Sequence, residues 1–300
     1  MPNNTIQLSK NYTTLLDEVY QAASVVGNLN TSPEMCRAGA NANEIVYPQI
    51  SVTGLGDYDR NSGYTTGAVD FKWKTATFNY DRGTKISVDV MDNEETSGLA
   101  FGMAGAELMR TKAAPEGDAF FFATVASFDR ISTATGEIKT PEQFLEALLT
   151  AWSKMSDDEV PEEDRHLYAR GELLDSVMKL ESYKSKDILG KFASRKSVPS
   201  ARFYTDIDML DGKTEGEELG HYKKSENAGA IDFMIIHKPA IIKFDKHVAN
   251  DIIPASMNAN ADADILKYRK YAMVDSYHNK RAGIYMHSNA VSGTGTEIGK

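Results

Sequence analysis

The stretch of residues 52–116 changes its hydrophobic period partway along, and this change limits the possible folds more than any other feature of the chain. It opens with a polar segment rich in glycine and tyrosine, residues 54–64. Apolar and charged residues then alternate, and the apolar ones are Val69, Phe71 and Trp73. After a turn expected at residues 81–83 (Asp-Arg-Gly), alternation resumes over residues 86–90. Because a two-residue period places successive side chains on opposite faces, the stretch predicts strands with one apolar face.

A helix is expected directly after the second of these strands, because the period lengthens there to about 3.6 residues. Asp92 with Glu95 resembles a capping box, and acidic side chains favour the positive end of a helix. Basic residues fall in the last turn and Pro115 follows as a stop signal. The pattern therefore predicts one helix over residues 92–112.

The apolar face of the first strand needs a surface to lie against. The preceding residues 44–52 also alternate, with Val46, Ile50 and Val52 on one face. Pro48 cannot donate a backbone hydrogen bond, so we expect an edge strand there. Because an isolated two-stranded ribbon is only marginally stable in water, we expect the ribbon to lie on another copy of the protein.

The composition argues against several function classes. With 300 residues and 41 % hydrophobic content, the chain can bury the core of one large domain or two small ones. Its net charge of −10 argues against a general nucleic-acid binder, which needs a clustered basic face. The single cysteine, Cys36, cannot form an intrachain disulfide and indicates a reducing compartment. No run approaches the roughly 20 apolar residues of a membrane span, so we expect no membrane contact.

The remaining chain mixes helical and extended patterns. The pattern predicts helices at residues 13–26, 119–127 (a buried helix or a helix end), 140–152 and 172–180. Extended patterns predict strands at residues 166–169, 201–207, 231–242 and 266–277, the last in a hairpin with residues 282–287. Residues 181–229 are otherwise expected to form surface loops. The first helix belongs either to an extended N-terminal arm or to its own domain. Because strands come first, helices in the middle and strands last, the order predicts an α+β fold.

The third of these helices has the clearest start signal. Thr140 is expected to cap it, with Pro141 at the first helical position. Its expected buried face is Phe144, Leu145, Leu148, Leu149 and Trp152.

Motifs for catalysis or cofactor binding are incomplete. Gly54 and Gly56 form a Gly-x-Gly without a third glycine or a following helix. Residues 57–68 begin like a calcium loop, but an alanine stands where the closing glutamate belongs. The acidic residues at 92–95 have a structural role at a helix start. We therefore predict no catalytic residue, no cofactor and no bound metal.

A series of sequence blocks carries a resemblance to a known family. The blocks are residues 54–67, 69–75, 80–83, 88–96, 114–119, 231–238, 267–271 and 283–287. In this order they resemble the major capsid proteins of tailed bacteriophages with the Hong Kong 97-type fold. No single block is a chemical signature, so the specificity comes from the series.

The resemblance implies an α+β fold with named parts. These are an N-arm (1–35), an extended β-hairpin loop (36–85), a peripheral domain with a long spine helix (86–124 and 236–275) and an axial domain (125–235 and 276–300).

The resemblance also implies a structural function rather than an enzymatic one. Copies would assemble into pentamers and hexamers that tile an icosahedral head shell, because heterologous contacts that close give rings. The shell would enclose double-stranded DNA without sequence-specific binding, and a negative wall would not grip that DNA during packaging. The protein would be made in the bacterial host cytoplasm and end in the virion. Candidate intersubunit contacts are Tyr58, Arg60, Tyr64, Val69, Phe71, Trp73, Arg82, Glu94 and Glu95.

Further partners are also implied. Some family members carry a long N-terminal scaffolding segment. The polar residues 1–10 and one helix are too short to form such a segment, so we expect a separate scaffolding protein. Portal and head-completion proteins would join the shell. One subfamily links its subunits through lysine–asparagine isopeptide bonds. No motif assigns such a bond here, and the possible participants are Lys72, Lys74, Asn258 and Asn260.

Two alternatives stay open. An encapsulin-type compartment would have the same fold and hold a cargo enzyme, and it would need an inner pocket for a cargo peptide. A soluble α+β enzyme with dispersed catalytic residues would be a monomer or small oligomer with a deep polar pocket.

Overall fold

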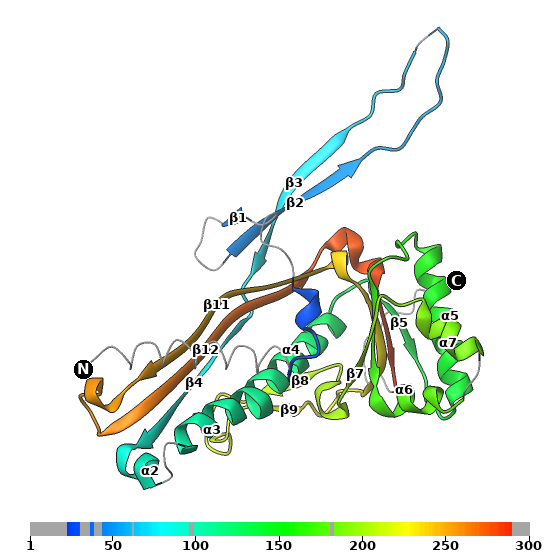
Figure 1. The fold of residues 1–300 in the computed structure, drawn as a ribbon. Coiled ribbons are helices and arrows are strands. Elements are labelled where there is room, and N and C mark those ends of the chain that lie inside the picture. The colour runs from blue at the N-terminus through cyan, green and yellow to red at the C-terminus, as the bar shows by residue number, and fades with distance from the viewer. Residues whose placement is uncertain are drawn as a thin grey trace.

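The computed structural model describes residues 23–30, 37–38, 44–61, 63–95, 99–180 and 183–289. A ribbon of strands extends far from the rest of the chain (Figure 1). The rest combines a long narrow sheet, with helices running beside it, and a wider sheet covered by helices.

The ribbon is an antiparallel pair, β2 (Glu44–Val52) and β3 (Val69–Thr77). The two-residue β1 (Arg37–Ala38) pairs with Val46 and Ile45 at its root. Pro48 lies beyond this short pairing, on an edge that no described strand covers. β2 lies between β1 and β3 at the root, so the expectation of an edge strand holds for its outer part, where Pro48 lies.

The long sheet has the antiparallel order β11–β12–β4. Its strands are β11 (Ile241–Ile253), β12 (Ala263–Ser276) and β4 (Tyr80–Asp89), and a short 3-10 turn, η6 (Ala255–Met257), joins the first two. The hairpin predicted between residues 266–277 and 282–287 is wrong, because the 3-10 segment η7 (His278–Gly283) carries the chain to the other sheet. The partner of β12 in its hairpin is β11.

The turn predicted at residues 81–83 is also wrong, because β4 continues through it. Gly83 lies opposite Arg269 of β12. A Cβ atom on Gly83 would come within 2.7 Å of the Tyr268 carbonyl oxygen. The glycine therefore permits a close approach of two strands rather than a turn.

The helix predicted at residues 92–112 is longer and less regular than expected. The described residues give a short helix, α2 (Val90–Glu95), and then a continuous run of α3 (Leu99–Leu108), the π-helical segment η3 (Met109–Ala113) and α4 (Ala114–Ala126). Pro115 does not end it, because the proline falls in the first turn of α4, where its missing N–H is tolerated most easily. The helix expected at residues 119–127 is the end of α4.

The wide sheet has the order β5–β13–β10–β6–β7. Its strands are β5 (Ser132–Thr135), β13 (Ile284–Ser288), β10 (Ile231–His237), β6 (Arg165–Arg170) and β7 (Ser194–Val198). Every residue of β10 is buried. Phe233 and Ile235 pack toward α5 (Pro141–Asp157), α6 (Gly171–Met178) and α7 (Tyr183–Gly190), whereas Met234 and Ile236 pack with α4. Coverage of both faces explains why residues 233–236, in the middle of this strand, form an unbroken apolar run.

Residues 181–229 contain more structure than the predicted loops. They include α7, β7, the 3-10 turn η4 (Ser200–Arg202) and a small hairpin of β8 (Ile207–Met209) and β9 (Tyr222–Lys224). The strand predicted at residues 201–207 is wrong over most of its length. In α7 the buried apolar residues are only Ile188 and Leu189, too few to produce a recognisable helical period.

Helix α5 begins as predicted. The Gln143 N–H donates to Thr140 Oγ1, and the Gln143 side chain completes the capping box, with Pro141 in the first turn. Leu148 is fully buried, but Leu149 is 41 % exposed, so its predicted place on the buried face is wrong.

Of the N-terminal region, residues 23–30 lie against the body of the protein. Val26 and Leu29 join the same apolar core as α4, beside the 3-10 turn η1 (Gly27–Leu29). The helix predicted at residues 13–26 lies mostly outside the described residues.

Candidate functional site

The outer part of the ribbon presents an apolar face whose large side chains are about half exposed or more. Because residues directly opposite each other in a ladder point to the same side, the β2–β3 register places these side chains on one face. We call this set the outer apolar face, and its members are Pro48, Ile50, Val52, Val69, Phe71 and Trp73. Trp73 is 45 % exposed and Val69 is 68 % exposed. The ring centroids of Phe71 and Trp73 lie 5.4 Å apart in an edge-to-face contact. This contact orients the two rings and leaves both about half exposed.

The root of the ribbon buries its other face. Ile45, Tyr47 and Ala76 pack against Ile242 and Met273 of the long sheet. Successive strand residues point to opposite sides, so the face toward the long sheet is apolar at the root and polar farther out. The polar residues on it farther out include Gln49, Asp70, Lys72 and Lys74. The outer apolar face is therefore turned away from the surface that supports the root.

The polar tip between β2 and β3 is ordered by its own contacts. The Tyr58 and Tyr64 rings lie 4.9 Å apart. Asp59 and Gly63 exchange two backbone hydrogen bonds, of 3.2 and 2.7 Å, and Gly63 takes the left-handed φ of 80° that favours glycine. Tyr58, Arg60 and Tyr64 are all exposed here. Three of the predicted contact residues therefore come together at the far end of the ribbon.

Arg82 lies apart from the ribbon residues, in a network within the subunit. Its Nε donates to Glu116 Oε1 at 2.7 Å, and its Nη2 donates to the Leu210 carbonyl oxygen at 2.7 Å. His221 Nδ1 lies 3.4 Å from Glu116 Oε2, and the Tyr80 hydroxyl donates to Glu116 Oε1 at 3.2 Å. Burial alone would raise the pKa of the Glu116 carboxyl, but the hydrogen bonds with His221 and Arg82, together with the charge of Arg82, lower it. Arg82 thus has a structural role, and its intersubunit contact stays a prediction.

The last two predicted contact residues, Glu94 and Glu95, belong to α2. This short helix directly follows β4 at one end of the long sheet (Figure 1). The predicted set is therefore divided among the ribbon, the network of Arg82 and Glu116, and α2.

Asp118 is a buried carboxylate that the sequence reasoning missed. It accepts hydrogen bonds from Ser24 Oγ at 2.7 Å and the Val25 N–H at 2.9 Å, and Arg202 Nη1 lies 3.1 Å away. These contacts hold residues 23–30 on α4 and η4. The only signal was a charged residue directly before an apolar helical run.

The described residues contain no cluster of three or more histidine, cysteine, aspartate or glutamate side chains able to hold a metal ion. None of the helices that the structure describes is long and apolar enough to cross a membrane.

Comparison with solved structures identifies the fold. A chain of Mycobacterium phage Che8 superposes with a TM-score of 0.58 at 14 % identity, over 88 % of this chain and 90 % of that one. The capsid of the cyanophage P-SCSP1u gives a TM-score of 0.58 at 14 % identity, over 90 % and 89 %. The virus-like particle from Pyrococcus furiosus gives 0.57 at 10 % identity, over 93 % and 99 %. Searches of family models and of curated proteins each find no match.

These similarities extend over nearly the full length of each chain. At such low identity they establish the arrangement of the chain and leave its activity to be inferred. The predicted α+β class is confirmed, and the chain has the Hong Kong 97-type fold found in phage capsids.

Proposed function

We propose that the chain is a major capsid protein of a tailed bacteriophage. Copies assemble into pentamers and hexamers, and these form an icosahedral head shell around double-stranded DNA. The observation that carries the proposal is the outer apolar face, which is ordered, apolar and turned away from its own subunit.

The energetics of this face favour an intermolecular contact. A fully buried large apolar side chain contributes about 1.5–3 kcal/mol, and those of the outer apolar face are roughly half exposed in the single subunit. Covering them on a neighbour would contribute on the order of 1 kcal/mol for each side chain. Because every copy carries the same ribbon, the gain is repeated around each closed ring.

In this proposal the parts of the chain take the roles that the fold family implies. Residues 36–85 are the extended loop that crosses a neighbouring subunit, and residues 1–35 are the N-arm. Residues 86–124 and 236–275, which include most of the long sheet, are the peripheral domain. Residues 125–235 and 276–300, which include most of the wide sheet, are the axial domain that faces the symmetry axes.

The proposed role is structural and requires no catalysis. The net charge of −10 suits a shell whose inner wall must let DNA move during packaging. A separate scaffolding protein would direct assembly, and portal and head-completion proteins would complete the head. The subunit would be made in the host cytoplasm and reside in the virion.

A second candidate is a closed protein compartment that holds a protein cargo. The virus-like particle from Pyrococcus furiosus, which is matched over 99 % of its chain, supports a closed particle of this fold and is compatible with either content. The two proposals predict the same subunit contacts and differ in the content of the shell.

The decisive experiment is negative-stain microscopy and sedimentation of the chain, expressed with and without its neighbouring genes. Closed shells tens of nanometres across would support assembly, and nucleic acid or protein inside them would separate the two candidates. A persistent monomer or dimer, even with a scaffolding partner present, would instead favour a soluble α+β enzyme.

The substitution Trp73→Asp tests the ribbon itself. It places a charge on the outer apolar face, so we expect no closed shells, while circular dichroism of the subunit stays unchanged. Gln49→Glu is the matched control, because it adds the same charge on the polar face of the same ribbon, opposite Lys72. Normal shells from Trp73→Asp would rule out the assembly role of this face.

A further inference from the structure

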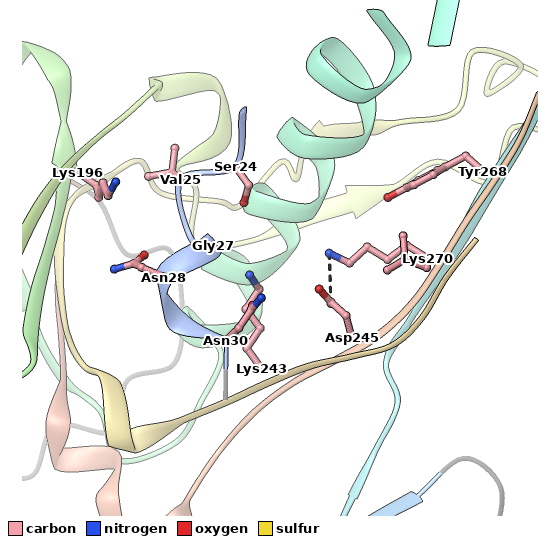
Figure 2. A pocket seen from close by; sticks show the side chains of 11 residues that line it. Ser24, Val25, Gly27, Asn28, Asn30, Lys196, Lys243, Asp245, Tyr268 and Lys270 are labelled. Carbon is pink, nitrogen blue, oxygen red and sulfur yellow. Dashed lines mark ion pairs between the residues drawn. The ribbon is translucent and has the colours of Figure 1, made fainter. Parts of the chain in front are cut away.

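Residues 23–30 dock on the body of the subunit through apolar and polar contacts. Val26 and Leu29 join the apolar core beside α4. Asn28 lies between them in the chain and takes a different direction. Figure 2 shows it extending to the side where Lys196 of β7 lies. The Asn28 side chain is therefore placed to connect the N-terminal segment with the wide sheet.

Three side chains of the wide sheet contact Asn28. The Tyr168 hydroxyl donates to its Oδ1 at 2.8 Å. Its amide nitrogen, Nδ2, lies 3.4 Å from Ser194 Oγ and 3.4 Å from His166 Nδ1. His166 and Ser194 are direct partners in the β6–β7 ladder, and their Nδ1 and Oγ atoms lie 2.7 Å apart. His166 therefore belongs to the polar contact that holds the segment on β6 and β7.

These contacts assign the protonation of His166. Because the Tyr168 hydroxyl donates to Asn28 Oδ1, the end of the amide that faces His166 Nδ1 is the donor, Nδ2. A ring nitrogen that faces a donor accepts, and the neutral imidazole then carries its proton on Nε2. Nε2 is buried and has no hydrogen-bond partner among the described residues. The contact with Asn28 is thus complete only while Nδ1 carries no proton.

The surroundings disfavour a positive charge on His166. The residue is 9 % exposed, and burial is the main cause that lowers the pKa of its imidazole. Asp164 acts in the opposite direction, whereas Lys196 and Lys238 lower the pKa further. The titratable and charged groups around His166 are Asp164 before β6, Tyr168 of β6, Lys196 of β7, His237 of β10 and Lys238 of η5. Residues 23–30 contain no charged side chain, so the segment itself offers no counter-ion.

We propose that His166 is an acid-sensitive latch, and that uptake of a proton at its Nδ1 releases residues 23–30 from the wide sheet. The added N–H would point a second donor at Asn28 Nδ2, and the positive charge would be buried without an anion from the segment. Both effects are relieved when the segment leaves and water reaches the imidazole. The inference concerns the single subunit and does not depend on the proposed shell function.

Release should increase on acidification. The pKa of His166 is lowered while the segment is docked, and it returns toward the ordinary value of about 6.5 when the segment is released. Docking is therefore strongest above about pH 6.5 and weakens as the pH falls below that value. For one proton, the equilibrium constant for release should rise up to about tenfold between about pH 7.5 and about pH 5.5.

Hydrogen–deuterium exchange of the dispersed subunit, followed by mass spectrometry, measures this release at the amides of residues 23–30. Protection factors, corrected for the intrinsic exchange rate at each pH, should fall up to about tenfold in the wild type between about pH 7.5 and about pH 5.5. In His166→Gln the two protection factors should be alike, because glutamine does not titrate in this range. Equal protection of the wild type at both pH values would overturn the proposal, as would a wild-type response in His166→Gln.

Asn28→Asp is a second test, and it keeps the histidine. A carboxylate at this position would still accept from Tyr168 and would attract a protonated His166, so protection should rise on acidification instead of falling. Asn30→Asp is the matched control, because it adds the same charge to the same segment at an exposed position. The control should keep the direction of the wild-type response. An equal fall in protection in both variants would overturn the role of His166.

Two other titratable groups are separated from His166 by variants of their own. Asp118 also holds the segment, through Ser24 and the Val25 N–H. Asp118→Asn should therefore lower protection at both pH values and keep their ratio. His237 is a second buried histidine, and His237→Gln should also keep the ratio of the wild type. Loss of the pH response in either of these variants, with the response kept in His166→Gln, would assign the sensor to that residue and overturn the proposal.

Discussion

At the scale of single residues, Glu116 joins three parts of the subunit. It lies in α4, accepts hydrogen bonds from Tyr80 and Arg82 of β4, and lies beside His221, which precedes β9. Its side chain is only 9 % exposed, so little water screens these contacts.

The substitution Glu116→Gln should lower the free energy of unfolding by about 2–3 kcal/mol, because it leaves the partly buried Arg82 without its anion. The folded-state pKa of Glu116 is lowered, so its stabilisation is present above the unfolded-state pKa and is lost as the pH falls through the folded-state pKa. Urea unfolding of the dispersed subunit at about pH 7 and about pH 4 measures this. The wild type should lose more stability than the variant on acidification, and equal losses would contradict the assignment.

Gly83 tests whether close strand approach is the reason for this glycine. In Gly83→Ala the new Cβ would meet the backbone of β12 at 2.7 Å, so we expect a loss of about 1–3 kcal/mol in unfolding free energy. Gly54→Ala is the control, since a Cβ there meets nothing within 4 Å and should change stability by less than about 0.5 kcal/mol. Chemical denaturation measures the unfolding free energy of both variants. An unchanged unfolding free energy in Gly83→Ala would mean that β4 and β12 can move apart at no cost.

At the scale of elements, α5 shows how an amphipathic period is divided between core and solvent. Leu148 and Leu149 are neighbours of the same residue type, but only Leu148 faces the sheet. Their side chains point about 100° apart around the helix axis.

Leu148→Ala should therefore lower the free energy of unfolding by about 3 kcal/mol, because it leaves a cavity between α5 and the wide sheet. Leu149→Ala should stay within about 0.5 kcal/mol of the wild type. The pair is compared by thermal or urea unfolding of the dispersed subunit. A similar cost at both positions would show that Leu149 is covered, for example by a neighbouring copy that remains bound.

At the scale of the whole molecule, the ribbon is separable from the fold. Residues 45, 47 and 76 anchor its root, and the outer strand residues contribute nothing to the described core clusters. Replacing residues 48–73 with an Asn-Gly turn would join Tyr47 to Lys74, which already lie opposite each other.

We expect this shortened chain to keep its unfolding free energy within roughly 1 kcal/mol, because no residue of the described core clusters is removed and the connection becomes shorter. It should form no closed shells, even with a scaffolding partner. Unfolding curves and electron microscopy measure the two properties. Shells from the shortened chain would contradict the proposed function, and an unfolded chain would contradict the separation of ribbon and core.

Local sequence patterns were enough to predict much of the secondary structure of this protein. The two-residue period of β2 and β3, the start of α5 at Thr140 and Pro141 and the apolar run at residues 233–236 were all readable, because each depends on neighbours within a few residues. The series of blocks was enough to predict the fold class. The outer apolar face could be predicted from β3 alone, since alternation assigns side chains to faces before any partner is known.

The tertiary structure decided the features that depend on distant residues. Gly83 was expected to turn the chain, but its role is set by β12, far along the sequence. Pro115 was expected to end a helix, yet a π-helical segment places it in a new first turn. The partner of β12, and the burial of Asp118, Lys243 and Lys270, likewise follow from packing between segments. Sequence periodicity describes which side of an element is apolar, whereas only the folded chain determines which surface meets it.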